Sequence, residues 1–196
     1  MGEMIKMVVV LTFLSVISGG ALAYVQKNTT NLIEDNKLQF VKGPAIKSIL
    51  SGASNNPVSD RFTIEQGEKK DIFFVGKYDG NPKAVAFESS GKGFGGDVYI
   101  VLGVDLETDK LLGVGVTTHS ETPGVGARAA TDPTFVSQFK GQALQGTFKV
   151  KADGGQVDAI GGATITSRAV SAALTDASKL YSELKPQIVE KAKALK

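Results

Sequence analysis

The chain has 196 residues, of which 42% are hydrophobic and 21% charged, and this composition is typical of a globular protein rather than a disordered one. Its 22 basic and 20 acidic residues are scattered along the sequence and give a net charge of +2, so no basic stripe indicates a nucleic-acid partner. Cysteine is absent and histidine occurs once, which excludes disulfides and thiolate-ligated iron–sulfur clusters and argues against a zinc site within this chain. Any redox chemistry here therefore needs an organic cofactor.

Residues 7–25, MVVVLTFLSVISGGALAYV, form an uncharged run. As a helix this run spans about 28 Å, close to the ~30 Å hydrocarbon core of a bilayer, and it predicts a membrane anchor over residues 1–25. The alternative is a signal peptide, because ALA at 21–23 resembles a small-residue cleavage site. We favour the retained anchor, since the apolar part of a cleaved signal is ordinarily shorter, ~7–15 residues. An N-terminal anchor predicts a single-pass protein of the cell (inner) membrane, with the following domain outside the cytoplasm.

Residues 26–60 are predicted to be a linker with short helices, and they end in the loop SGASNNPVSD. Two short strands are expected within 62–78, around the turn EQGEKK, and a third strand at 83–88. The clearest hairpin pairs 98–106 with 111–117 across the polar turn ETDK, because both runs are rich in Val, Ile and Leu.

A short helix is predicted next, with its N-cap at residue 131 or 132, Pro133 near its first position and Gly141 as its stop. Residues 147–152 are expected to form another strand. The last 30 residues carry apolar side chains at three- and four-residue spacing and predict a helix, which Pro186 is expected to kink or split.

The order of these elements predicts the fold class. Strands come first and helices near the end, without alternation, which indicates an α+β fold: a mostly antiparallel sheet with helices packed on it, behind one N-terminal transmembrane helix. The folded domain is expected to cover residues 61–196. A Rossmann fold is excluded because no Gly-x-Gly-x-x-Gly segment follows a first strand and opens a helix.

The segment DAIGGATITSRAV, residues 158–170, sets three hydroxyl side chains directly behind a small-residue turn. The turn is Gly161, Gly162 and Ala163, and the hydroxyls belong to Thr164, Thr166 and Ser167. Small residues let another molecule approach the backbone, and the free N–H groups at a helix start suit a phosphate. A threonine hydroxyl here can bond to such a phosphate or be esterified to it. From these residues alone an ordinary helix cap stays equally open.

DAIGGATITS resembles the flavinylation motif of the FMN-binding domain family, which is Asp, two residues, Ser or Thr, Gly, Ala, Thr. That family includes the C subunit of the sodium-pumping NADH:quinone oxidoreductase and the G subunit of the Rnf electron-transport complex, and the chain length fits the latter better. The resemblance implies that a separate flavin transferase recognises Asp158 and joins FMN to Thr164 through a phosphoester bond. Gly161 departs from the pattern, because the family usually has Ser or Thr there.

A second segment, HSETPGVGAR at 119–128, resembles the His-x-Glu-Thr-Pro-Gly-x-Gly loop of the same family. Its proline and glycines predict a rigid turn with a bare backbone. The resemblance implies that this loop lies beside the flavin ring and that the cofactor-binding residues, besides Thr164, are Gly161, Gly162, Ala163, Thr166, His119, Glu121, Thr122, Pro123 and Gly124. His119 by itself fits a solvated loop side chain as well. The glycine-rich turn GKGFGGDVYI, 91–100, fits either a bulge before a strand or a segment close to the flavin.

The resemblance implies a membrane-anchored flavoprotein that relays electrons through covalent FMN in an ion-translocating, Rnf-type oxidoreductase complex, with no catalytic residues of its own. The chain has no candidate nicotinamide site, so partner proteins of the complex with iron–sulfur clusters or other flavins are expected to deliver and remove the electrons. Three alternatives stay open: a free-standing extracytoplasmic flavoprotein reductase, a non-enzymatic anchored binding module, and, if ALA at 21–23 is cleaved, a secreted soluble domain.

Overall fold

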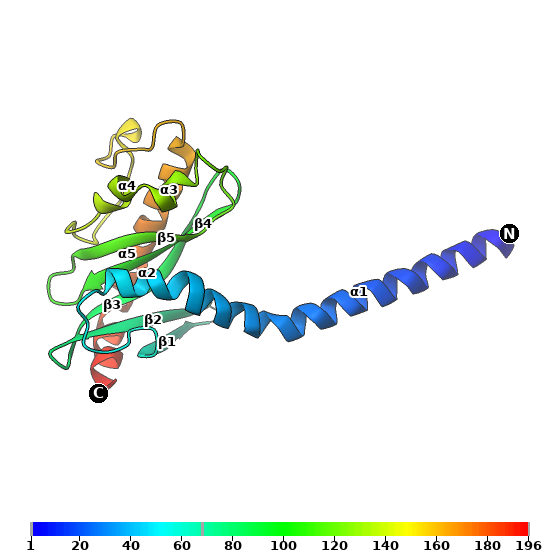
Figure 1. Cartoon of the computed structure of the whole chain (residues 1–196), viewed down its shortest axis with the longest axis horizontal. Coiled ribbons are helices and arrows are strands. Elements are labelled where there is room, and N and C mark those ends of the chain that lie inside the picture. The colour runs from blue at the N-terminus through cyan, green and yellow to red at the C-terminus, as the bar shows by residue number, and fades with distance from the viewer. Residues whose placement is uncertain (1, 68, 196) are drawn as a thin grey trace. The chain divides into compact units, whose positions relative to one another are not determined.

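The structure is a computed structural model that describes residues 2–67 and 69–195. It divides into two compact units, one ending at Phe40 and one beginning at Val41. The first unit consists mainly of the long helix α1 (Gly2–Lys37), whose stretch Gly2–Thr30 is long and apolar enough to cross a membrane (Figure 1).

Helix α1 passes residue 25, the predicted end of the anchor, without a break. The polar residues that follow remain helical, and three of them, Asn28, Thr29 and Thr30, donate side-chain hydrogen bonds to carbonyl oxygens one turn earlier, Thr29 to Val25. Asn28 donates to Tyr24 at 3.0 Å and Thr30 donates to Gln26 at 2.6 Å. The division into residues 1–25, 26–60 and 61–196 therefore stays a prediction, with its first boundary inside a continuous helix.

The second unit contains a five-stranded antiparallel sheet in which sequence neighbours are also neighbours in space (Figure 1). The strands are β1 (Arg61–Gln66), β2 (Lys69–Tyr78), β3 (Asn81–Lys92), β4 (Asp97–Asp105) and β5 (Leu111–Thr118). Each matches a strand expected from the sequence, and the β4–β5 hairpin pairs Leu102 with Val114 and Val104 with Leu111. The predicted α+β class with a mostly antiparallel sheet is confirmed.

Two helices cover the sheet. The main core joins the long C-terminal helix α5 (Thr164–Ala194) to β3 and β4, and alternate β4 residues such as Leu102 and Val104 belong to it. Between them, Gly103 faces the short helix α2 (Gly43–Ile49), which follows the π-helical turn η1 (Leu38–Lys42). A Cβ at Gly103 would collide with Ile49, so this glycine lets α2 approach the strand.

After β5 the chain forms the two short helices α3 (Arg128–Thr131) and α4 (Pro133–Ser137). Asp132 is the N-cap of α4, because its carboxylate accepts a hydrogen bond from the N–H of Thr134 at 3.0 Å. The predicted cap and the position of Pro133 are confirmed, although the helix ends at Ser137, before Gly141.

The strand predicted at 147–152 is wrong. Phe148 and Val150 are buried and their neighbours are exposed, as in a strand, but this segment has only one isolated bridge, from Val150 to Val157, before the 3-10 turn η2 (Lys151–Asp153). Pro186 also does not split the last helix, since α5 continues through it to Ala194.

Candidate functional site

The site is built around the start of α5. Gly162 has φ of +79°, a left-handed conformation that favours glycine, and it turns the chain into the helix. The N-cap residue, Ala163, makes no side-chain capping bond within the described part of the chain. The N–H groups of the first turn of an α-helix have no intrahelical acceptor, and the helix dipole places positive charge beside them. This helix start is therefore suited to a negatively charged group.

The three hydroxyls of the first turn have different surroundings. Ser167 is fully buried, donates to the carbonyl of Ala163 and accepts from the N–H of Ile160, both at 3.0 Å. Thr166 is 2% exposed and donates to the carboxylate of Glu121. Thr164 is half-buried and lines a pocket, and its hydroxyl has no hydrogen-bond partner among residues 2–67 and 69–195.

The pocket at this helix start has a volume of about 410 Å³. It is lined by residues from three segments that are distant in sequence: Phe94, then Glu121, Thr122, Val125 and Gly126, then Gly162, Ala163, Thr164, Ile165 and Thr166. Three of these side chains are apolar and exposed, with Phe94 74% exposed, Val125 43% and Ile165 47%. The pocket thus has an apolar rim beside a helix start that suits an anion.

Glu121 is the charged side chain in the wall of this pocket, and it is 6% exposed. Its Oε1 accepts a hydrogen bond from the N–H of Gly95 at 2.8 Å, and its Oε2 accepts from Thr166. Burial alone raises the pKa of the Glu121 carboxyl, but the hydrogen bonds from Thr166, Gly95 and Phe94, together with nearby His119, outweigh burial and hold this pKa below its usual value. Glu121 is therefore an ionised, buried carboxylate at neutral pH.

Glycines surround this carboxylate. A Cβ at Gly93 would lie 2.5 Å from Oε1 of Glu121, and a Cβ at Gly126 would lie 2.6 Å from its Oε2. Gly95, which donates to the carboxylate, is itself pressed against the backbone carbonyl of Ser120. The glycine-rich turn after β3 therefore contacts the loop after β5, and its bare backbone encloses Glu121.

The pocket brings together six of the predicted site residues: Glu121, Thr122, Gly162, Ala163, Thr164 and Thr166. It does not include His119, Pro123, Gly124 or Gly161. The Nδ1 atom of His119 accepts from the N–H of Glu121 at 3.3 Å, so the imidazole binds its own loop. Asp158 is exposed, and its carboxylate pairs with the ammonium of Lys151 at 2.7 Å.

Four lining residues, Phe94, Val125, Gly126 and Ile165, were not among the predicted site residues, although the first three lie in the segments 91–100 and 119–128 that the sequence analysis had singled out. Phe94 carries a usable signal of its own, because it is a large apolar residue flanked by glycines in an expected turn. Ile165 resembles any residue of a helix start, and only the fold brings it beside the other segments.

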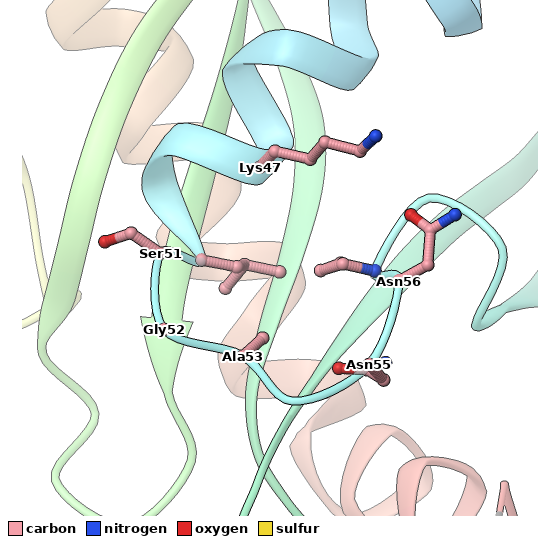
Figure 2. Close-up of a pocket in the computed structure, with 8 residues that line it drawn as sticks. Lys47, Ser51, Gly52, Ala53, Asn55 and Asn56 are labelled. Carbon is pink, nitrogen blue, oxygen red and sulfur yellow. The ribbon is translucent and has the colours of Figure 1, made fainter.

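A second, smaller pocket of about 270 Å³ lies between the end of α2 and the following loop. Figure 2 shows Lys47 on the helix and Asn55 and Asn56 on that loop. The Asn55 amide donates to the Val75 carbonyl and its oxygen accepts from the N–H of Lys77, both at 2.8 Å. These bonds tie the loop to β2, so the polar groups of Asn55 are engaged in structure.

The first pocket suits a ligand with a phosphate at one end and a planar aromatic ring at the other. The start of α5 can receive the phosphate, with the Thr164 hydroxyl beside it. The apolar rim of Phe94, Val125 and Ile165 can receive the ring.

Comparisons with known proteins point to the same region. A family model described as the FMN-binding domain matches residues 93–179, which include all three pocket-forming segments. The G subunit of the ion-translocating oxidoreductase complex of Methanosarcina acetivorans is 32% identical over 177 residues, covering 89% of this chain and 93% of that protein. Its counterpart in Stutzerimonas stutzeri is 37% identical over 122 residues, covering 59% of this chain. The alignment spans 53% of that counterpart's length.

Among solved structures, the C subunit of the Na(+)-translocating NADH-quinone reductase of Parabacteroides distasonis is similar with a TM-score of 0.57 and 22% identity. The likeness covers 73% of this chain and 92% of that one. It shows a shared fold.

Proposed function

This chain belongs to the family of the G subunits of ion-translocating oxidoreductase complexes and has their FMN-binding domain, and we propose that it carries FMN covalently on Thr164 and relays electrons within such a complex. The observation that carries this proposal is the difference between the three hydroxyls at the start of α5. Thr166 and Ser167 are buried and hydrogen-bonded, whereas Thr164 faces the pocket without a partner in the described part of the chain. Thr164 is thus the hydroxyl that is free to form a phosphoester.

The residues around Thr164 have complementary parts in holding FMN. The free N–H groups at the start of α5 stabilise the negative charge of the phosphodiester. The apolar side chains of Phe94, Val125 and Ile165 offer surface for the isoalloxazine ring, and Thr122, which also lines the pocket, can offer its hydroxyl for a polar contact. The cofactor supplies the electron-transfer chemistry, and the chain supplies binding, orientation and charge.

Covalent attachment suits this pocket because its apolar rim is open to solvent. Phe94 is 74% exposed, so the pocket does not enclose a ligand on that side. A phosphoester keeps the cofactor at an open site, where a neighbouring protein can approach the ring closely. A chain without cysteine depends on partner proteins of the complex with iron–sulfur clusters or other flavins to deliver and remove electrons.

The remaining parts of the chain are assigned to anchoring and to modification. We propose that α1 anchors the protein in the cell (inner) membrane as a single span, with the flavin domain outside the cytoplasm. The exposed Asp158 carboxylate, six residues before Thr164, is proposed as a contact for the flavin transferase. The pocket's open rim is proposed to face the partner proteins of the complex.

The proposed relay is tested in membranes that contain the whole complex, with this chain as wild type, Thr164→Ala or Ser182→Ala. Ser182 is exposed on α5 well away from the pocket and serves as the matched control. Wild type and Ser182→Ala should support electron transfer to the terminal acceptor, and Thr164→Ala should lose it while the complex still assembles. Full electron transfer by an assembled Thr164→Ala complex would contradict the proposal.

A further inference from the structure

Glu121 is a buried negative charge in the wall of the pocket. Its two oxygens are held by the N–H of Gly95 and the hydroxyl of Thr166. In the described part of the chain it forms no ion pair with lysine or arginine, and the His119 imidazole of the same loop lies near it. A carboxylate that is removed from water and unpaired exerts a stronger field on its surroundings than an exposed one, because less solvent screens it.

The surrounding backbone keeps the carboxylate desolvated. The Gly93 and Gly126 backbones lie against its two oxygens at distances that leave no room for a Cβ. Water therefore has little access to these oxygens from either glycine segment. Glu121 lines the same pocket as Thr164, so the field of its charge acts on whatever occupies that pocket.

We propose that Glu121 lowers the reduction potential of the flavin by presenting a fixed negative charge to the pocket. This inference rests on the proposed function, in which a partner redox centre supplies an electron to the ring. Adding that electron adds one negative charge unless a proton accompanies it, and the nearby Glu121 carboxylate opposes the added charge. Glu121 itself exchanges neither a proton nor an electron.

Two substitutions separate charge from shape. Glu121→Gln removes the charge but keeps the size: the amide oxygen can still accept from Gly95, and the amide nitrogen can donate to the oxygen of Thr166. Thr166→Val leaves the Glu121 carboxylate charged but removes the hydroxyl group whose hydrogen bond partly offsets that charge. Glu107→Gln removes an exposed charge from the β4–β5 turn and is the control for net charge.

The experiment is a redox titration, followed by flavin absorbance, of the full-length chain made with a flavin transferase and purified in detergent. The midpoint potential should rise in Glu121→Gln, fall in Thr166→Val and stay unchanged in Glu107→Gln. The midpoint potentials of Glu121→Gln and Thr166→Val should shift in opposite directions. A general distortion of the pocket would not produce opposite shifts.

An FMN-loaded Glu121→Gln chain with an unchanged or lower potential would overturn this inference alone. A shift of both pocket variants in the same direction would also overturn it. If Glu121→Gln does not fold, Thr166→Val decides by itself, and an unchanged or higher potential contradicts the inference. Intact-mass spectra identify the samples that carry FMN. A wild-type chain that carries no FMN would overturn the proposed function and this inference together.

Discussion

Thr166, in the first turn of α5, donates its hydroxyl hydrogen to the carboxylate of Glu121, which lies 45 positions earlier in the loop after β5. The same carboxylate accepts the N–H of Gly95 in the turn after β3. One buried side chain therefore joins all three segments that line the pocket. A change at any of these contacts is expected to alter the pocket as well as the stability of the fold.

The first prediction concerns Gly95. Gly95→Ala would place a Cβ against the carbonyl of Ser120 and push the turn away from Glu121. Overpacking of this kind costs about 1–3 kcal/mol, and each kcal/mol lowers the melting temperature of a domain of this size by roughly 2–4 °C. Gly161→Ala is the matched control, because a Cβ there meets nothing within 4 Å. Equal melting temperatures for the two variants would show that the turn is not tightly packed.

The second prediction concerns Thr122, which is exposed and lines the pocket. Thr122→Val nearly keeps the shape of the side chain and removes its hydroxyl, so we expect a stability change within about 0.5 kcal/mol. The covalent FMN content should be retained, while the midpoint potential of the flavin or the turnover of the assembled complex changes. Melting temperature, flavin content and redox titration are measured on the same sample. A steep fall in melting temperature with unchanged redox behaviour would assign this loop a structural role.

The third prediction tests the proposed transferase contact at Asp158. The ion pair between Asp158 and Lys151 is largely exposed, so Asp158→Asn should change stability by less than about 1 kcal/mol. At limiting transferase, however, the fraction of chain that carries FMN should fall. Asp176→Asn breaks a similarly exposed pair with Lys179 and should leave FMN loading unchanged. Intact-mass spectra over a time course give the fraction of each variant, Asp158→Asn and Asp176→Asn, that carries FMN. Equal loading rates for the two variants would exclude Asp158 as a contact for the transferase.

The fourth prediction is a pH dependence at Asp109, in the β4–β5 turn. Burial raises the pKa of this carboxyl, but hydrogen bonds from Lys185 at 2.6 Å and Tyr181 at 2.8 Å outweigh burial and hold the pKa below its usual value. A lowered pKa stabilises the fold above the ordinary Asp pKa of about 3.9, and the gain is lost as pH falls below it. Asp109→Asn should therefore cost about 1–2 kcal/mol at pH 7 and progressively less below about pH 4.

Asparagine is the suitable replacement because Asp109 has φ of +56°, a conformation that asparagine also tolerates. Thermal unfolding of both proteins at neutral pH and at two acidic pH values, one on each side of the ordinary Asp pKa, checks the prediction. A difference in melting temperature that stays constant with pH would show that the charge of Asp109 does not stabilise the fold.

Much of the sheet could be predicted from the sequence, because local patterns decided it. The β4–β5 hairpin has apolar runs on both sides of a polar turn, and Asp132 is followed by Pro133, as at many helix starts. The strand predicted at 147–152 failed because side chains can be buried alternately without their backbone pairing with the sheet. Phe148 and Val150 are buried against the core, yet the sheet has no further strand there in the described part of the chain.

The pocket was predicted only in part, since its contacts are not local. The motif at 158–164 and the loop at 119–126 identified Thr164 and Glu121 through a family resemblance. The hydrogen bond from Thr166 to Glu121 could not be predicted from the sequence, because it depends on how α5 packs against the loop after β5. For the same reason the turn 91–100 was left open between a bulge and a segment close to the flavin, and Phe94 was not named as a site residue.

Helix α5 shows how packing overrides a local signal. Pro186 removes one backbone donor, yet the helix continues because Leu184 and Ile188 on its inner side are buried in the core. Pro186 itself is on the exposed side, where water can satisfy the carbonyl that lost its partner.

Covalent attachment of FMN to Thr164 is tested most directly by peptide mapping, by mass spectrometry, of the full-length chain after expression with a flavin transferase. The peptide that contains Thr164, Thr166 and Ser167 should gain the mass of FMN minus one water, and fragmentation should place that mass on Thr164. Thr164→Ala should remove the added mass and the yellow colour while the protein stays folded. FMN found on Thr166, or a yellow and covalently labelled Thr164→Ala chain, would contradict attachment at Thr164.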